Sequence, residues 1–577
     1  MRTRRSRLRI TVAVLAIFAV VSVFVVRLVD IQIVQAQELN AEALTKRAQE
    51  LVTYGTRGTI VDANGAVLAS TVERYDITAS PRSALTGPDA TATASAALAQ
   101  IAGVTGQDPA ALLTVLTDDP TSDFVYLKQG VTLDVFRAVR DLDVPWVYFE
   151  LRQSRTYPNG ELAGNLVGFI GTDGPQAGLE LSEDDCLAAT NGSATYEKGE
   201  DGTRLPGSLV TTKEPKDGGT LRLTIDRDLQ FFVQQRMAQT YNDLGAEWVT
   251  AVIMRVSDGH LMSVVDYPTV DPNDPGKAPR DALGSRAFSW AYEPGSTMKT
   301  LTAATLLDLG LVDPYTQVVA PGRIYLSDGG FIKDAWAHDD TRYTLTGALV
   351  DSSNTAFSLL SGSVDAETRR NYMLAFGLNQ ETEVGFLSES EGLVHPTSEW
   401  DERTNYTVQF GQGLSLTAVQ LASAYQAIGN GGVRSPVALV EGCEHGDGTV
   451  TDLPQGEERR VISEGAARQT LDMMESLVSV GPNAGTLQIP GYRIAAKSGT
   501  AEVAENGVYG DKAVISYAGL APAEDPQYVV AVSAGIPSSM YSSTDIAGTF
   551  HDVMAQTLTT FRVAPSGQSS PSLPLTW

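Results

Sequence analysis

The segment Glu293–Lys299 (EPGSTMK) constrains this chain more than any other feature. A Pro-Gly pair interrupts the chain there, and a mostly apolar run from Met298 to Leu309 ends at a glycine, which predicts a helix that begins at Ser296. Residues three apart lie on one face of a helix, so we expect the Lys299 amine within reach of the Ser296 hydroxyl. Because first-turn amides have no intrahelical partner, the Ser296 N–H is free to bind a developing oxyanion.

This pair predicts nucleophilic chemistry. A serine hydroxyl is a poor nucleophile until a base removes its proton, and lysine can be that base only where burial or nearby positive charge lowers its pKa. Two downstream segments offer partners: Asp351-Ser352-Ser353-Asn354 and Lys497-Ser498-Gly499-Thr500-Ala501. In the first, Ser352 offers a proton relay and Asn354 an amide to fix Lys299 or a substrate carbonyl. In the second, Lys497 adds a cation, and Gly499 would let a substrate backbone lie close.

Each motif alone is weak evidence, because S-x-x-K and S-x-N are common on exposed helices and K-S-G is often a turn before an edge strand. Their occurrence together, in this order, matches the catalytic signature of penicillin-binding proteins and serine β-lactamases. Other segments resemble the class B penicillin-binding proteins in particular, so that the resemblance covers roughly residues 10 to 560. They are Arg57–Gly65, Gly178-Leu179-Glu180, Leu223–Asp226 with Leu229-Gln230, Ser285-Arg286-Ala287, Phe410-Gly411-Gln412-Gly413 with Thr417 and Gln420, and Asn430-Gly431-Gly432. Two positions depart from the family pattern: Ser498, where many members have threonine, and Ala63, where the pedestal motif usually has arginine.

The resemblance implies an α+β chain with the penicillin-binding transpeptidase fold, which is the acyl-serine transferase or β-lactamase-like fold. That fold has a five-stranded antiparallel sheet with helices on both faces, preceded here by a dimerisation-type pedestal domain and one transmembrane helix. Local signals agree, since Asn64-Gly65 and Ser257-Asp258-Gly259 predict hairpins and the Gly-rich stretch 191–219 predicts a domain boundary. Residues 85–145 and most of 296–430 are predicted to be helical. The expected division is a basic tail at 1–9, a transmembrane anchor at 10–30, the pedestal at 31–219, the transpeptidase domain at 220–563 and a disordered Ser/Pro-rich tail at 564–577.

The resemblance also implies a role for each site residue. Ser296 would attack the carbonyl of the penultimate D-alanine in a stem peptide that ends in D-Ala-D-Ala, and Lys299 would accept its proton. Ser352 would pass a proton to the departing D-alanine, and the N–H groups of Ser296 and Thr500 would form the oxyanion hole. Lys497, with the hydroxyls of Ser498 and Thr500, would bind the terminal carboxylate. An amine of a neighbouring stem peptide would then resolve the acyl-enzyme, and β-lactams would acylate the same serine.

The amino terminus predicts the compartment. Ile10–Val26 is an apolar run, and about 17 helical residues would span roughly 25 Å, enough to cross a hydrocarbon core. The arginines before it predict a cytoplasmic amino terminus and an exported body, so the chain is expected at the cell membrane with a single pass. A cleaved signal peptide is the alternative, with a weak site at Val34-Gln35-Ala36. The length of the run favours an uncleaved anchor, followed by a juxtamembrane helix over residues 28–51.

Composition excludes several functions. The formal net charge is −27, so the body has no electrostatic footprint for nucleic acid. The five histidines and two cysteines show no metal-binding spacing and no nucleotide-binding motif is present, so no metal and no cofactor is expected. An exported body would permit a Cys186–Cys443 disulfide, but such sparse cysteine usage favours two unbonded thiols.

The expected partners are stem peptides, β-lactams and the membrane itself. Class B proteins commonly work beside a multispanning glycosyltransferase and other cell-wall synthesis proteins, and residues 64–76 look closer to the septal members than to the elongation members. Three alternatives stay open: a membrane-anchored serine β-lactamase or β-lactam sensor, a bifunctional synthase, and a non-catalytic scaffold of the division machinery. The β-lactamase would need a dedicated deacylation base, and the synthase a glycosyltransferase domain before residue 220; the sequence shows neither.

Overall fold

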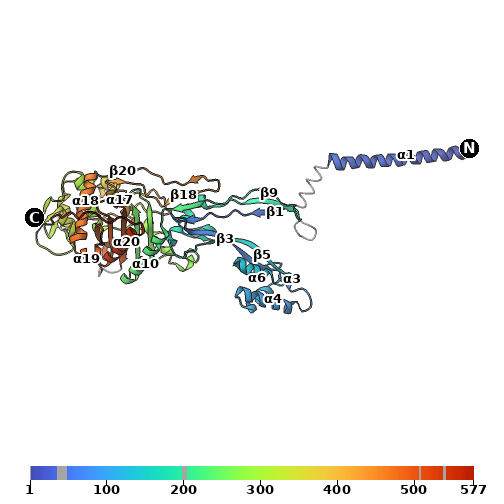
Figure 1. Cartoon of the computed structure of the whole chain (residues 1–577), viewed down its shortest axis with the longest axis horizontal. Helices are drawn as coiled ribbons and strands as arrows, with labels where there is room; N and C mark the ends of the chain where they lie inside the picture. The colour runs from blue at the N-terminus through green and yellow to red at the C-terminus, as the bar shows by residue number, and fades with distance from the viewer. Residues whose placement is uncertain (1, 36–47, 198–204, 506–507, 537–540) are drawn as a thin grey trace. The chain divides into compact units, whose positions relative to one another are not determined.

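The computed structural model describes residues 2–35, 48–197, 205–505, 508–536 and 541–577 (Figure 1). Helix α1 (Arg2–Val29) continues into a short π-helical turn at Asp30–Val34. The segment Arg7–Val34 contains an 18-residue window of mean hydropathy 2.9 and is long and apolar enough to cross a membrane. The juxtamembrane helix predicted over 28–51 is wrong at its end, where residues 48–51 lie in a strand, and its middle at 36–47 lies outside the described residues.

Two compact units divide the chain, and the first comprises residues 1–56 and 189–218. Its sheet has the order β1 (Ala48–Thr53), β8 (Gly192–Glu197) and β9 (Val210–Lys213), with each pair antiparallel. The Gly-rich stretch expected to be a boundary linker therefore supplies two strands. Their residues are half-buried or exposed in most positions, so backbone hydrogen bonds rather than an apolar pattern define them.

The second unit comprises residues 57–188 and 219–577, so residues 31–219 do not form one separate body. The reason is strand pairing: β2 (Ile60–Val61) lies parallel to β10 (Thr220–Leu223) in one sheet. The predicted turn at Asn64-Gly65 is confirmed, since β2 and β3 (Val67–Ala79) are antiparallel neighbours and Gly65 has a φ of +84°.

Residues 67–156 of this unit form a small α/β layer. Strand β3 pairs with both β4 (Val125–Val131) and β5 (Val147–Thr156). The longer helices of this layer pack on the sheet through a common apolar core: α4 (Ala90–Thr105), α5 (Pro109–Thr117) and α6 (Leu133–Arg140). The helical prediction for 85–145 is therefore confirmed for these three segments and is wrong for β4.

A buried ion-pair network ties the two ends of residues 57–188 together. The Glu180 carboxylate is fully buried and accepts hydrogen bonds from Arg57 Nε at 2.8 Å and from Arg155 Nε at 2.6 Å. Two guanidinium groups thus compensate one carboxylate, as a buried charge requires. Arg57 and Glu180 belong to the two segments that carry the pedestal resemblance.

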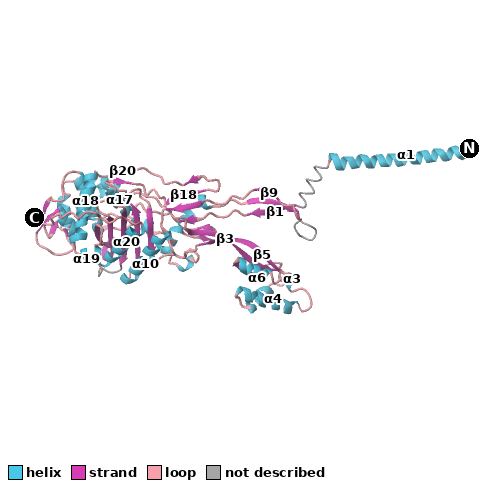
Figure 2. Ribbon diagram, viewed as in Figure 1, coloured by secondary structure: helices cyan, strands magenta, loops and turns pink. Residues whose placement is uncertain are grey.

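The main sheet has the order β12 (Leu261–Tyr267), β11 (Trp248–Arg255), β23 (Tyr528–Ile536), β22 (Val508–Ala521) and β21 (Ala495–Glu505). All neighbours are antiparallel, and β21 is an edge strand. Figure 2 shows strands in magenta and helices in cyan in this part of the chain. Alternate side chains of β11 enter two different cores, one shared with α10 (Arg227–Leu244) and α20 (Thr544–Thr560), the other with α12 (Met298–Asp308) and α17 (Ala418–Gly429). The predicted five-stranded antiparallel sheet with helices on both faces is confirmed.

Short strands interrupt the expected helical region between residues 296 and 430. β13 (Gln317–Ala320) pairs with β16 (Thr341–Thr344), and β14 (Arg323–Tyr325) pairs with β15 (Phe331–Lys333). This excursion lies between α12 and α13 (Leu345–Val350), and it carries part of the wall of the site described below.

The carboxyl-terminal tail was predicted to be disordered, and this is wrong. The Thr344 N–H donates to the Leu575 carbonyl at 3.0 Å, and the Arg342 guanidinium lies 4.9 Å from the centre of the Trp577 ring. The Ser/Pro-rich tail contains three large apolar side chains, Leu573, Leu575 and Trp577. The first two pack against the hydrophobic cores. Such anchors order a segment that composition alone assigns to disorder.

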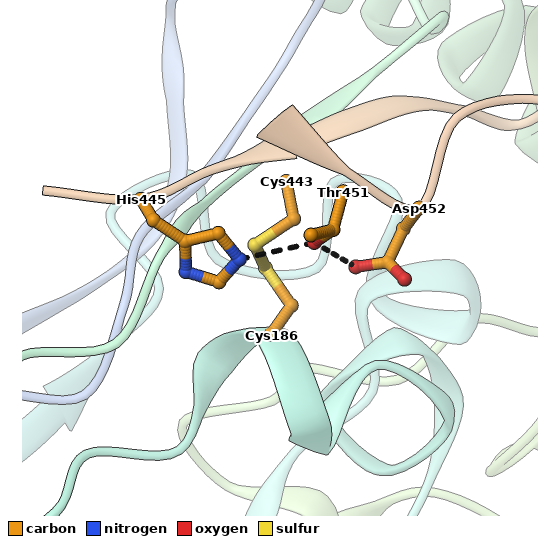
Figure 3. Close-up of a disulfide and its surroundings, with 5 residues drawn as sticks. All are labelled: Cys186, Cys443, His445, Thr451 and Asp452. Atoms are coloured by element: carbon orange, nitrogen blue, oxygen red, sulfur yellow. Dashed lines mark hydrogen bonds between the residues drawn. A yellow bond between two sulfur atoms is a disulfide. The ribbon is translucent and has the colours of Figure 1, made fainter. Parts of the chain in front are cut away.

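Cys186 and Cys443 form a disulfide, with a Cα–Cα distance of 6.0 Å (Figure 3). The expectation of two unbonded thiols is therefore wrong. Cys186 lies in α9 (Asp184–Leu187), and Cys443 lies in β18 (Val440–Glu444), which pairs with β10. Gly219 leaves room for the bridge, because a Cβ there would come within 2.4 Å of Cys443 Sγ.

Removing this bridge is expected to destabilise the second unit. The Cys186→Ser/Cys443→Ser double variant should lose about 2–4 kcal/mol of unfolding free energy, since the crosslink constrains the unfolded chain across a long loop. Denaturant unfolding of the full chain in detergent measures it. A reductant should lower the wild-type midpoint and leave the double variant unchanged; equal responses of the two proteins would show that no bridge forms.

Candidate active site

Ser296 lies in a single 3₁₀ turn, Gly295–Thr297, that runs directly into α12, as predicted. Gly295 has a φ of +56°, and a Cβ there would come within 2.6 Å of the Thr500 carbonyl. Its N–H donates to the Gly411 carbonyl at 3.0 Å. Only glycine satisfies both the backbone conformation and the close approach to β21, so the turn that presents Ser296 is built against that strand.

The Lys299 amine joins Ser296 to Ser352. Lys299 Nζ lies 3.0 Å from Ser296 Oγ and 3.1 Å from Ser352 Oγ, and it also donates to the Ser352 carbonyl. Ser352 lies between α13 and α14 (Asn354–Leu360) with a φ of +62°. A non-glycine residue adopts this left-handed conformation only where its surroundings impose it, and here the conformation aims both oxygens at one amine.

Lys497 completes the cluster from β21. Its Nζ lies 3.0 Å from Ser352 Oγ and 3.1 Å from the Ser498 carbonyl. Both lysines are fully buried. A continuous hydrogen-bonded chain therefore runs from the Ser296 hydroxyl through Lys299 and Ser352 to Lys497, and a proton can move along it without entering solvent.

Burial controls the charge of both amines. Burial lowers the pKa of Lys299 far below its ordinary value, the positive charge of Lys497 lowers it further, and Asp334 opposes them. Burial alone lowers the pKa of Lys497 to about 7. Two ammonium groups on one hydroxyl repel each other, so the pair titrates in separate steps. A proton held by the pair therefore favours Lys497, and Lys299 favours the neutral form that a general base needs.

A cleft of about 230 Å³ opens over this cluster. β21 borders it as the edge strand of the main sheet, and such an edge can pair with an extended peptide backbone. The residues that line the cleft are Ser296, Ala335, Trp336, Ser352, Asn354, Phe410, Gln412, Ser498, Thr500 and Ser543.

Alternation along β21 separates the predicted substrate-binding residues into two groups. Ser498 and Thr500 line the cleft, whereas Gly499 and Ala501 do not. A Cβ on Gly499 would come within 2.4 Å of Ser516 Oγ and 2.7 Å of the Pro294 carbonyl. The glycine is therefore required for packing against the nucleophile turn, and the expectation that it makes room for a substrate backbone is not supported.

Asn354 reaches the cleft but not Lys299. Its Nδ2 donates to the Lys333 carbonyl at 2.9 Å, which ties α14 to β15. Of its two predicted roles, fixing Lys299 is therefore wrong, and contact with a substrate carbonyl stays a prediction.

Several residues that shape the site carry no motif in the sequence. The buried Asp334 carboxylate accepts hydrogen bonds from Ser353 Oγ at 2.7 Å and from the N–H of Thr355 at 3.1 Å. The Phe410 ring lies 5.8 Å from Lys299 Nζ. Phe410 stands in a segment already noted for its resemblance, whereas Asp334 follows a short strand and had no signal that could have identified it.

A second cluster contains residue types that often bind metals, but its two sulfur atoms cannot act as ligands. Cys186, Cys443 and Asp452 bring potential ligand atoms within 4.8 Å of one another beside the bridge in Figure 3. Because the two sulfur atoms are bonded to each other, neither is a thiolate, and we assign no metal to this group.

Known proteins share both the domains and the whole architecture. Residues 249–555 match the family described as penicillin binding protein transpeptidase domain, and residues 52–223 match the penicillin-binding protein dimerisation domain. Penicillin-binding protein PbpB of Mycolicibacterium smegmatis is 34% identical over 594 residues, which span 97% of this chain and 91% of that protein. Peptidoglycan D,D-transpeptidase FtsI of Escherichia coli is 30% identical over 525 residues, which span 90% and 86% of the two chains. The crystal structure of penicillin binding protein 3 from Mycobacterium tuberculosis complexed with aztreonam, 29% identical, superposes with a TM-score of 0.70 and covers 91% of this chain and 100% of that chain.

The buried Lys497 amine should lower the free energy of unfolding of the protein at neutral pH. Its pKa is lowered to about 7 from 10.5, so between these values the unfolded chain binds more protons than the folded chain and stability rises with pH. The Lys497→Met variant should gain on the order of 1–4 kcal/mol at pH 7, and the gain should shrink toward pH 10.5.

Denaturant unfolding at several pH values measures this gain, with Lys128→Met on the exposed face of β4 as the matched control, expected to lie within about 0.5 kcal/mol of wild type. A Lys497→Met protein less stable than wild type at pH 7 would contradict the prediction.

Proposed function

This chain belongs to the penicillin-binding protein transpeptidases that carry a dimerisation domain, and from that premise we propose that it is a monofunctional peptidoglycan D,D-transpeptidase of class B. Its substrates are stem peptides that end in D-Ala-D-Ala. The observation that carries the proposal is the 3.0 Å contact between the Ser296 hydroxyl and the amine of a fully buried lysine. An unprotonated amine one helical turn from a serine is the activated nucleophile that acyl transfer requires.

The first half-reaction uses the whole cluster. Lys299 Nζ takes the Ser296 proton as Oγ attacks the carbonyl carbon of the penultimate D-alanine. The N–H groups of Ser296 and Thr500 bind the oxyanion that forms. When the C–N bond breaks, a proton from Lys299 passes through the Ser352 hydroxyl to the amine of the departing D-alanine. The product is an ester between Ser296 and the stem peptide.

The second half-reaction reverses the proton path. An amine of a neighbouring stem peptide attacks the ester carbon, and the chain Lys299–Ser352 removes its proton. The new amide is the cross-link, and Ser296 regains its proton from Lys299. Neither half-reaction as written requires a metal or an organic cofactor.

Lys497 supplies recognition of the substrate's terminal carboxylate. Its pKa of about 7 means that the empty site is only partly charged near neutral pH. A bound carboxylate raises the pKa of the amine and draws a proton to it. Ser498 and Thr500, which line the cleft on the same strand, offer hydroxyl donors to the same carboxylate.

β-Lactams are expected to acylate the same serine. Solved structures of the Mycobacterium tuberculosis relative hold aztreonam and ampicillin. The shared fold and the Ser296–Lys299 geometry support the same ester with the opened lactam ring here.

The membrane arrangement and the partner belong to the same proposal. The α1 segment, with its arginines before the apolar run, supports a single-pass anchor with a cytoplasmic amino terminus and an exported body. FtsI and PbpB among the relatives support cell wall synthesis at the division septum. The proposed partner, a multispanning glycosyltransferase, rests on the resemblance to class B proteins alone.

Labelling with a fluorescent penicillin tests the proposal. Wild-type full-length protein in detergent should form one covalent adduct, Ser296→Ala none, and Ser289→Ala, which changes an exposed hydroxyl a few residues earlier, the wild-type amount. The same preparation, given a D-Ala-D-Ala peptide and an amine acceptor, should release D-alanine and form the cross-linked product.

Other outcomes identify the alternatives. Rapid turnover of the penicillin, with loss of the adduct within seconds, would indicate a β-lactamase. A stable adduct without peptide cross-linking would favour a β-lactam sensor. Labelling of Ser296→Ala, or no labelling of wild type, would overturn the acyl-serine mechanism and favour a scaffold.

A further inference from the structure

The segment from Asp334 to His338 forms one wall of the cleft. A contact between its first and last residues closes it into a loop. Ala335 and Trp336 line the cleft, and the Trp336 side chain is 41% exposed. At the ends of the segment, His338 Nε2 lies 2.9 Å from Asp334 Oδ2. The wall that faces a substrate is therefore a short loop held by an Asp–His pair.

The surroundings of His338 favour its charged form. Its Nε2 faces a carboxylate, and its Nδ1 lies 2.7 Å from the Asp339 carbonyl, so each ring nitrogen has an oxygen that only accepts. Burial lowers the pKa of His338, but the hydrogen bonds and charges of Asp339 and Asp334 outweigh it and leave the pKa raised. The ring therefore binds a proton more tightly than an unperturbed histidine does, and the facing Asp334 carboxylate favours its charged form.

Asp334 reaches from this ring to the turn that carries Ser352. Its carboxylate is fully buried and accepts hydrogen bonds from Ser353 Oγ and from the N–H groups of Asn354 and Thr355. These three residues directly follow Ser352, whose left-handed backbone aims its hydroxyl and carbonyl at Lys299. One carboxylate therefore holds the turn from which the Lys299 amine takes two of its hydrogen bonds.

We infer that Asp334 and His338 are a positioning pair for the transfer reaction, in which the Asp334 carboxylate holds the turn that carries Ser352 against Lys299 and the His338 charge balances the charge of that carboxylate. The inference rests on the proposed acyl-serine function and adds two residues to it. Neither residue touches the reacting atoms. Both act through Ser352, Lys299 and the Trp336 wall.

The charges that face the pair come from a few elements. Asp339 and Asp340 follow His338, and Arg323 of β14 lines the same open hollow. These are solvent-exposed or half-exposed groups, so water and salt screen them. From β16, Tyr343 faces Asp334, and burial together with Asp351 and Asp334 raises the pKa of its hydroxyl, so it is neutral.

Three causes act on the pKa of Lys299. Burial lowers the pKa of Lys299, Lys497 lowers it further, and Asp334 raises it. Among the described carboxylates around the pair, Asp334 is the one that combines full burial with a direct effect on Lys299. Its removal should therefore lower the pKa of the base, whereas removal of the balancing cation at His338 should raise it.

Two substitutions test the pair with opposite expectations. Asp334→Asn keeps the shape, because an amide oxygen can accept the two backbone N–H groups and the amide nitrogen can face Ser353 and a neutral imidazole. His338→Gln keeps a donor toward Asp334 without the charge. The measurement is the second-order rate of acylation of full-length protein by a fluorescent penicillin as a function of pH.

The acid limb of that profile reports the pKa of the base in the free enzyme. It should move to lower pH by about one pH unit in Asp334→Asn and to higher pH by a similar amount in His338→Gln. Asp340→Asn removes an exposed carboxylate from the same segment and should leave the limb in place. His338→Arg, which restores a cation, should return the limb toward the wild-type position.

Other results would overturn the inference. Wild-type limbs in both variants, shifts in the same direction, or a shift in Asp340→Asn equal to that in Asp334→Asn would each show that the pair only supports the loop. If Asp334→Asn does not fold, the comparison of His338→Gln with His338→Arg decides alone. A wild-type protein that is not acylated would instead contradict the proposed function, so the two failures are distinguishable.

Discussion

Two lysine amines buried on either side of one serine hydroxyl are the interaction on which this structure depends. Burying an ammonium group is strongly unfavourable, so burial favours the neutral amine at both Lys299 and Lys497. Three elements that are distant in sequence must converge to bury them: the start of α12, the turn at Ser352 and the edge strand β21. The remainder of the second unit can be understood as the framework that holds these three together.

The framework reaches the cluster through close backbone contacts rather than side chains. Gly295, Gly411 and Gly499 lie where the nucleophile turn meets β21 and the 3₁₀ turn Val408–Phe410, and a Cβ at any of them would collide with backbone or with a buried side chain. Such contacts fix the Ser296 oxygen to within a fraction of an ångström, which a hydrogen bond to a single amine requires. The Cys186–Cys443 bridge offsets part of the stability that the two buried amines cost.

What the sequence could predict follows from how local each interaction is. The Ser296–Lys299 contact depends on helical periodicity within four residues, and the β11–β12 hairpin depends on one turn, so both could be predicted. The disulfide depends on the pairing of β10 with β18, across more than two hundred residues, and no local signal carries it. Strands β8 and β9 lack an apolar pattern, and Asp334 lacks a motif. Gly499 was recognised, but the direction of its missing side chain depends on which side of β21 faces the nucleophile turn.

The distribution of charge explains why the two lysines are not equivalent although they share one hydroxyl. Lys299 has Lys497 as a neighbouring cation and the Ser352 oxygens as acceptors, so its neutral form is favoured. Lys497 belongs to β21, the strand proposed to bind the substrate's carboxylate. A bound carboxylate would favour the charged form of the Lys497 amine. In the proposed mechanism, substrate binding would therefore place the proton on Lys497, the amine proposed to bind the carboxylate, and keep it away from Lys299, the proposed base. A site of this kind is incomplete until its substrate supplies the missing negative charge, which makes the substrate itself part of the electrostatic design that activates the serine.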